Sequence, residues 1–82
     1  MKEQIIEEVC DMLEYIGENT TVPRNIREVA VNTIELLEDD KMEESIKINT
    51  AIGNLDNISN DPNIPLHART MVWEILSKLE SI

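Results

Sequence analysis

Aliphatic side chains recur every three or four residues along four separate stretches of the chain. In residues 1–17 they are Ile5, Ile6, Val9, Met12, Leu13 and Ile16. This spacing places the side chains on one face of an α-helix. The later stretches predict inward-facing positions at Ile26, Val29, Ala30, Thr33, Ile34 and Leu37, at Ile48, Ile52, Leu55 and Ile58, and at Ala68, Val72, Ile75, Leu79 and Ile82. We therefore predict four amphipathic helices.

Residues that interrupt or begin helices separate these stretches. We expect Gly17 to end the first helix, because glycine readily takes the left-handed conformation just past a helix end. Pro23 and Pro65 are expected in the first turns of the second and fourth helices, where the missing N–H costs nothing. Asp40 and Glu43 have the spacing of a capping box for the third helix.

The second half of the chain matches the first when it is shifted by 42 residues without a gap. Val22-Pro23 then falls on Ile64-Pro65, and Arg27 falls on Arg69. A repeat of this length predicts two helical hairpins, residues 1–40 and 41–82. The coinciding core positions are Ile6 with Ile48, Val9 with Ala51, Leu13 with Leu55, Ile16 with Ile58, Ala30 with Val72, Ile34 with Leu76, and Leu37 with Leu79.

Two all-α architectures can be built from two such hairpins. The repeat length and the Pro-x-x-apolar-Arg pattern of the second helix resemble HEAT-type repeats, which stack into a solenoid. A solenoid of two hairpins would consist of end repeats only, with no internal repeat between them. We therefore favour an antiparallel four-helix bundle. Because 82 residues supply one hydrophobic core, we expect a single domain covering residues 1–82.

The chain is strongly acidic, with a formal net charge of −10. Such a surface repels phosphate backbones, which argues against direct nucleic-acid binding. Apolar runs are too short for a membrane span or a signal core. A single cysteine, Cys10, cannot form an internal disulfide. We therefore expect a cytoplasmic protein that does not bind membranes.

Two stretches and one tryptophan resemble the small archaeal proteins of uncharacterised protein family 0147. They are Val22-Pro23-Arg24-Asn25-Ile26-Arg27, the segment from Asp61 to Thr70, and the following Trp73. The resemblance extends over the whole chain and implies a compact four-helix domain. It implies no activity, cofactor or catalytic residue.

All three arginines are predicted at the bundle end that contains the turns within the hairpins. They are Arg24, Arg27 and Arg69. A cation near a helix N-terminus opposes the helix dipole, so each needs a compensating partner. One interpretation pairs Arg27 and Arg69 with loop carbonyls, Glu18 or Asp61. The other has the three arginines, His67 and free helix N–H groups bind an anion or a partner's carboxylate.

The sequence contains no recognisable catalytic or metal-binding set. With one histidine, His67, it cannot build a carboxylate di-metal centre or a zinc site of the usual kinds. Cys10 and His67 are predicted at opposite ends of the bundle. Gly53 falls inside the third helix, where we expect a close helix contact or a kink. We predict no enzymatic activity, no cofactor and no metal.

Trp73 and Leu66 lie together on the fourth helix, roughly 120° from the centre of its core stripe. That is too far round the helix for an ordinary bundle core. Arg69 lies one turn from both, and tryptophan and arginine are favoured at the centres of contacts. We therefore predict a module that binds another protein or self-associates into a homo-oligomer. The alternative is a bundle that binds an anion or a divalent cation.

Overall fold

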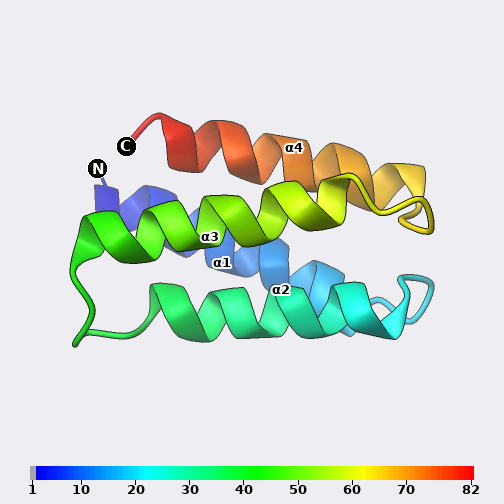
Figure 1. Ribbon diagram of the computed structural model, residues 1–82, viewed down its shortest axis with the longest axis horizontal. Helices are drawn as coiled ribbons and strands as arrows, with labels where there is room; N and C mark the ends of the chain where they lie inside the picture. Colours follow the sequence, from blue (N-terminus) through cyan, green and yellow to red (C-terminus); the bar gives the residue numbers. More distant parts are fainter. Residues whose placement is uncertain (1) are drawn as a thin grey trace.

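The computed structural model describes residues 2–82, which form four α-helices and no β-strand. The helices run antiparallel to their neighbours in the chain (Figure 1). They are α1 (Lys2–Glu18), α2 (Arg24–Leu37), α3 (Glu44–Ser59) and α4 (Leu66–Glu80). The all-α prediction is confirmed.

Each helix packs against its neighbours in sequence, and α4 also packs against α1. No Cα atom of α1 lies within 8 Å of one of α3, and none of α2 lies within 8 Å of one of α4, so these pairs are diagonal in the bundle. The helices therefore form a closed four-helix bundle, measuring 32 × 21 × 19 Å. This confirms the bundle and excludes the solenoid, because a solenoid would leave its first and last helices apart.

The loops within the two hairpins meet at one end of the bundle, called here the turn end (Figure 1). The loop between α2 and α3 lies at the opposite end, with both chain termini. The three arginines, at or just after the starts of α2 and α4, therefore lie towards the turn end, as predicted.

One hydrophobic core runs through the bundle. Leu13, Leu55 and Val72 are completely buried, and burying each such side chain stabilises the fold by roughly 1.5–3 kcal/mol. Buried Thr33 donates a 2.7 Å hydrogen bond to the Val29 carbonyl, which satisfies its hydroxyl. Predicted inward positions at the edges of the stripes are only partly buried: Ile5, Ile6, Met12, Val29, Ile34 and Ile52.

The terminal residue Ile82 contradicts the predicted inward face. Its side chain is 40% exposed. The reason is that α4 ends at Glu80, so Ile82 no longer follows the helical spacing that would turn it inward.

The starts of α3 and α4 follow those of α1 and α2 by 42 residues. Pro23 and Pro65 precede their helices as N-cap residues, one position earlier than predicted. Their carbonyls accept hydrogen bonds from the Arg27 and Arg69 backbone N–H groups at 3.0 and 2.9 Å. That the two hairpins are related by an internal repeat stays a prediction.

The predicted capping box is wrong, because α3 begins at Glu44 and Asp40 lies outside the helix. Glu43 is itself the N-cap and makes no side-chain capping bond. The loop instead turns at Asp39, whose carboxylate accepts a 2.8 Å hydrogen bond from the Lys41 N–H. A local aspartate turn has displaced the helix start.

Both glycines differ from expectation. Gly17 lies inside α1 with negative φ, so it is not a left-handed stop. A Cβ there would lie 3.1 Å from Cγ2 of Val31, so its small size allows α2 to approach α1. A Cβ at Gly53 would meet nothing within 4 Å, and α3 continues through it. Gly53 therefore makes no close helix contact.

Candidate functional site

The α4 surface exposes the two apolar side chains that the sequence singled out. Leu66 is 72% exposed and Trp73 is 53% exposed. Seven residues apart, they occupy similar angular positions on the helix, about 10 Å apart along its axis. Their prediction as residues outside the core is confirmed.

The contacts of α4 show which neighbour this surface faces away from. Lys78 lies 3.8 Å from the Glu8 carboxylate of α1, so the side of α4 that includes Lys78 faces α1. Leu66, Arg69 and Trp73 lie on the opposite side of the helix. Since α4 packs only against α1 and α3, these three residues lie on the side of α4 away from α1. We call this side the α4 outer face.

Arg69 is half-buried and tied to the preceding loop. Its Nη2 donates a 3.2 Å hydrogen bond to the Asp61 carbonyl. Its Nε is buried without a hydrogen-bond partner. The interpretation that Arg69 binds a loop carbonyl is confirmed, and this bond limits what the guanidinium can offer a ligand.

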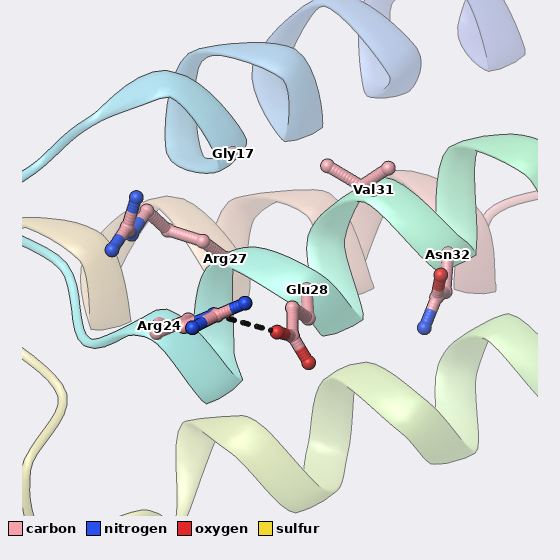
Figure 2. A pocket seen from close by; sticks show the side chains of 6 residues that line it. All are labelled: Gly17, Arg24, Arg27, Glu28, Val31 and Asn32. Atoms are coloured by element: carbon pink, nitrogen blue, oxygen red, sulfur yellow. Dashed lines mark hydrogen bonds and ion pairs between the residues drawn. The ribbon is translucent and has the colours of Figure 1, made fainter.

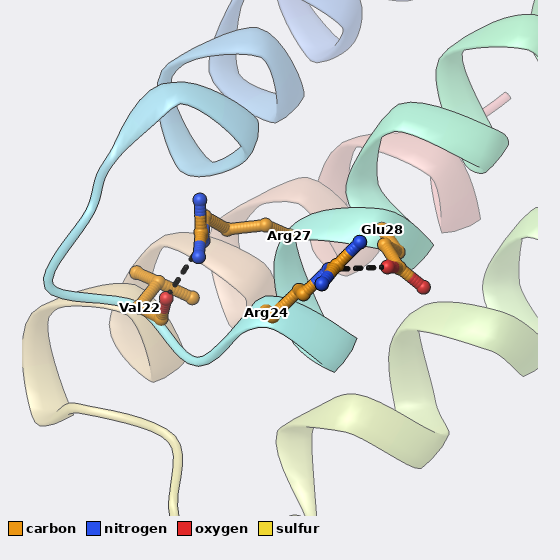
Figure 3. A network of polar contacts seen from close by, with 4 residues as sticks. All are labelled: Val22, Arg24, Arg27 and Glu28. Atoms are coloured by element: carbon orange, nitrogen blue, oxygen red, sulfur yellow. Dashed lines mark hydrogen bonds and ion pairs between the residues drawn. The ribbon is translucent and has the colours of Figure 1, made fainter.

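Arg27 makes a corresponding contact in the first hairpin. Its Nε donates a 2.9 Å hydrogen bond to the Val22 carbonyl (Figure 3). No carboxylate within salt-bridge distance of Arg27 is found in residues 2–82. Arg24, by contrast, pairs with Glu28 one turn later at 3.0 Å, and both side chains are largely exposed.

Arg24 and Arg27 border a shallow depression of about 390 Å³ on the α1–α2 surface (Figure 2). It is widely open to solvent, so it does not enclose a ligand. Its lining residues are Gly17, Arg24, Arg27, Glu28, Val31 and Asn32. The sequence did not single out Gly17 and Val31 for such a surface, because their proximity depends on how α1 and α2 pack.

The predicted polar group does not gather into one site. The His67 Nε2 lies 3.2 Å from the Asn19 side-chain nitrogen, so His67 faces the α1–α2 loop. Arg24 and Arg27 line the α1–α2 depression, whereas Arg69 lies on the side of α4 away from α1. An anion site that combines all three arginines with His67 is therefore not formed.

The sequence reasoning missed the low charge of the outer surface of α3. Ile46 is 52% exposed, and exposed Thr50, Gly53 and Asn57 follow it along the helix. The signal was available, because α3 contains only two acidic residues, whereas α1 contains six. Exposed apolar and uncharged side chains therefore accumulate on the second hairpin.

Cys10 is half-buried between acidic side chains. Burial, followed by the charges of Glu38, Asp11 and Glu14, raises its pKa from 9.0 to about 11. The thiol is therefore neutral at physiological pH, which makes it a weak nucleophile and a weak metal ligand. Within residues 2–82, no three histidine, cysteine or acidic residues gather closely enough to hold a metal ion.

None of the described helices is both long and apolar enough to cross a lipid bilayer.

Comparison with known proteins gives a consistent family match. The family described as "Uncharacterised protein family (UPF0147)" matches residues 1–82. A UPF0147 protein of Methanothermobacter thermautotrophicus is 49% identical over 82 residues, covering 100% of this chain and 80% of that protein. UPF0147 protein MJ1419 of Methanocaldococcus jannaschii is 48% identical over 80 residues, covering 98% and 86%.

Two crystal structures share the fold. A UPF0147 protein from Thermoplasma acidophilum has a TM-score of 0.94 at 34% identity, covering 98% of this chain and 94% of that one. The unknown function protein MMP1188 has a TM-score of 0.89 at 47% identity, covering 95% and 89%. Neither description names an activity or a ligand.

Proposed function

The chain belongs to the uncharacterised protein family UPF0147, and from its surface we propose that it is an interaction module that binds another protein through the α4 outer face. The observation behind this proposal is the exposure of Trp73 and Leu66 side by side on that face. Tryptophan is enriched at the energetic centres of protein interfaces, where its large surface leaves water.

The exposed apolar area of Trp73 and Leu66 indicates how large an interface the partner must form. Covering the exposed parts of Trp73 and Leu66 removes roughly 200 Å² of apolar surface from water, worth about 5 kcal/mol. Association itself costs about 4–15 kcal/mol. The two side chains can therefore anchor an interface but cannot hold one alone. A standard interface of about 800 Å² per partner would take roughly a sixth of the 5122 Å² surface.

We also propose that the protein acts without catalysis and in the cytoplasm. The neutral Cys10 thiol and the separation of His67 from the arginines support the first statement. The absence of a second cysteine in the sequence supports the second.

The test compares Trp73→Ala with a matched aromatic change elsewhere. Tyr15 on α1 is 55% exposed, almost the same fraction as Trp73, so Tyr15→Ala is the control. We expect Trp73→Ala to lose proteins that the tagged wild type captures from its native lysate, and Tyr15→Ala to retain them. Sedimentation of each purified variant reports self-association. Unchanged capture and unchanged oligomeric state for Trp73→Ala would refute the proposal.

A second candidate function is anion binding at the Arg24–Arg27 depression. It is favoured by Arg27, a half-buried cation without a carboxylate partner in the described chain. A ligand at a hundredfold its dissociation constant stabilises the folded state by about 2.7 kcal/mol. A thermal-shift screen of phosphate and small carboxylates should then raise the melting temperature of the wild type but not of Arg27→Gln. If no anion changes either melting temperature, this candidate is removed.

The divalent-cation alternative has weaker support. The acidic side chains of residues 2–82 do not converge into a group of three, so no ligand set is available for such an ion.

A further inference from the structure

We propose that the segment that binds the α4 outer face is a basic amphipathic helix, with lysine or arginine on both sides of a short apolar stripe. This inference rests on the proposed interaction function and specifies the chemistry of the partner. It follows from the charges around Trp73 and Leu66 and from the spacing of these two side chains.

Carboxylates border the apolar pair. Glu74 follows Trp73 and lies about 100° further round α4, towards Lys78. Glu80 lies on the same side of the helix as Trp73, two turns further along. The Lys47 ammonium donates to the Asp39 carbonyl just after α2, so the side of α3 that includes Lys47 faces α2. Asp56 lies on the opposite side of α3 and therefore on the side towards α4. All three carboxylates are exposed.

Two nearby cations do not balance this border. The Arg69 guanidinium donates to the Asp61 carbonyl, and the Lys78 ammonium, one turn after Glu74, lies 3.8 Å from the Glu8 carboxylate of α1. In residues 2–82 neither cation forms an ion pair with Asp56, Glu74 or Glu80, so three exposed carboxylates face two cations that contact other groups. Cationic side chains on the partner would complement this arrangement.

The same charges disfavour a second copy of this chain as the occupant. Each copy has a formal net charge of −10, and pairing two α4 outer faces would place their carboxylate borders against each other. Repulsion between such charges extends over the Debye length of about 8 Å at physiological ionic strength. A basic partner is instead attracted from a distance, which accelerates association.

The spacing of the apolar pair favours a helical partner. Leu66 and Trp73 form a strip along two turns of α4. A partner helix with apolar residues seven positions apart presents side chains at the same spacing, and its flanking positions can hold cations. The exposed Ser77, one turn after Trp73 on α4, is small and leaves room for a neighbouring helix.

The chain provides its own probe, because Trp73 is its only tryptophan. The experiment titrates the full-length protein with a helical peptide of leucine and lysine, and with the same peptide in which glutamate replaces every lysine. We expect the lysine peptide to shift Trp73 fluorescence to shorter wavelength in a saturable way that weakens with salt. The glutamate peptide should produce no shift.

Two charge-matched variants distinguish the effect of the carboxylates around Trp73 from the effect of the overall net charge. One combines Asp56→Asn, Glu74→Gln and Glu80→Gln around Trp73, and the other combines Glu3→Gln, Glu7→Gln and Asp11→Asn on α1. Each removes three negative charges from exposed positions. We expect about tenfold weaker binding of the lysine peptide for the first variant, and less than twofold for the second.

Several outcomes would overturn the inference. Equal weakening by the two variants would mean that only net charge acts. A shift of Trp73 fluorescence with protein concentration alone, together with a dimer in sedimentation, would identify a second copy as the occupant. No response to the lysine peptide, while Trp73→Ala still loses captured proteins, would reject the basic partner and leave the interaction function standing. Unchanged capture by Trp73→Ala would instead reject the interaction function itself.

Discussion

Replacing Gly53 with alanine should stabilise the protein. Glycine in a helix interior costs about 0.8–1 kcal/mol relative to alanine, because it loses more backbone freedom on folding. Gly53 lies in the interior of α3, and an added Cβ would meet no atom within 4 Å, so no steric cost opposes the gain. We expect Gly53→Ala to raise the free energy of unfolding by about 0.8–1 kcal/mol.

Thermal unfolding followed by circular dichroism measures this effect. For a domain of this size, about 1 kcal/mol corresponds to an increase of roughly 4–8 °C in the melting temperature. Urea unfolding should show a higher midpoint with an unchanged slope, which indicates a change in stability and not in compactness.

Gly17→Ala is the matched control, because it adds the same methyl group at a crowded helical position. There the Cβ would lie 3.1 Å from Cγ2 of Val31, so this side chain, 46% exposed, must move by a few tenths of an ångström. Overpacking costs about 1–3 kcal/mol in a well-packed core and less where the neighbour can move, so we expect Gly17→Ala to be less stable than Gly53→Ala. Val31→Ala should remove the crowding, so the double mutant should show a favourable coupling above about 0.5 kcal/mol.

A neutral or destabilising Gly53→Ala would refute the reasoning. It would mean that the backbone at Gly53 is not helical in solution, or that another molecule covers the position. Sedimentation at the concentration used for the melts distinguishes these two explanations.

Three further predictions follow from burial, hydrogen bonding and charge. Leu13 is completely buried and Leu66 is 72% exposed. In urea unfolding, Leu13→Ala should lower the free energy of unfolding by about 2–5 kcal/mol and Leu66→Ala by less than about 0.5 kcal/mol. Similar losses for the two variants would contradict the bundle core. Arg27→Lys removes the guanidinium that donates to the Val22 carbonyl and should cost about 1 kcal/mol, and an unchanged melting temperature would show that this bond contributes nothing. Raising the Cys10 pKa from 9.0 to about 11 should make alkylation at pH 8 roughly a hundredfold slower in the folded than in the urea-unfolded chain. An alkylation rate in the folded chain close to that in the unfolded chain would show that the thiol is not protected. The same raised pKa contributes stability that is present below pH 9 and is lost as pH rises towards 11.

The sequence predicted the helices better than it predicted their ends. Leu13, Leu55 and Val72 are buried as their spacing requires, because a helix turns every third or fourth side chain to the same face. Helix ends depend on competing local hydrogen bonds. The Asp39 turn therefore replaced the predicted box between Asp40 and Glu43.

The candidate site was predicted in part. The exposure of Leu66 and Trp73 followed from their position on the helical wheel, which needs no knowledge of the other helices. The grouping of Arg24, Arg27 and Arg69 with His67 in one anion site failed, because residues at one end of a bundle can still face different neighbours.

By itself, the sequence determined the number of helices, their inward faces and the excess of negative charge, because these depend on composition and on spacing along the chain. Only the tertiary structure decided which helices are neighbours and what each outward side chain lies beside. It placed Gly17 against Val31, left Gly53 open, and turned the Lys78 side of α4 towards α1, with Trp73 on the other side. The physical reason is that helical periodicity defines a direction around one axis, whereas a contact between helices depends on how two axes are placed relative to each other.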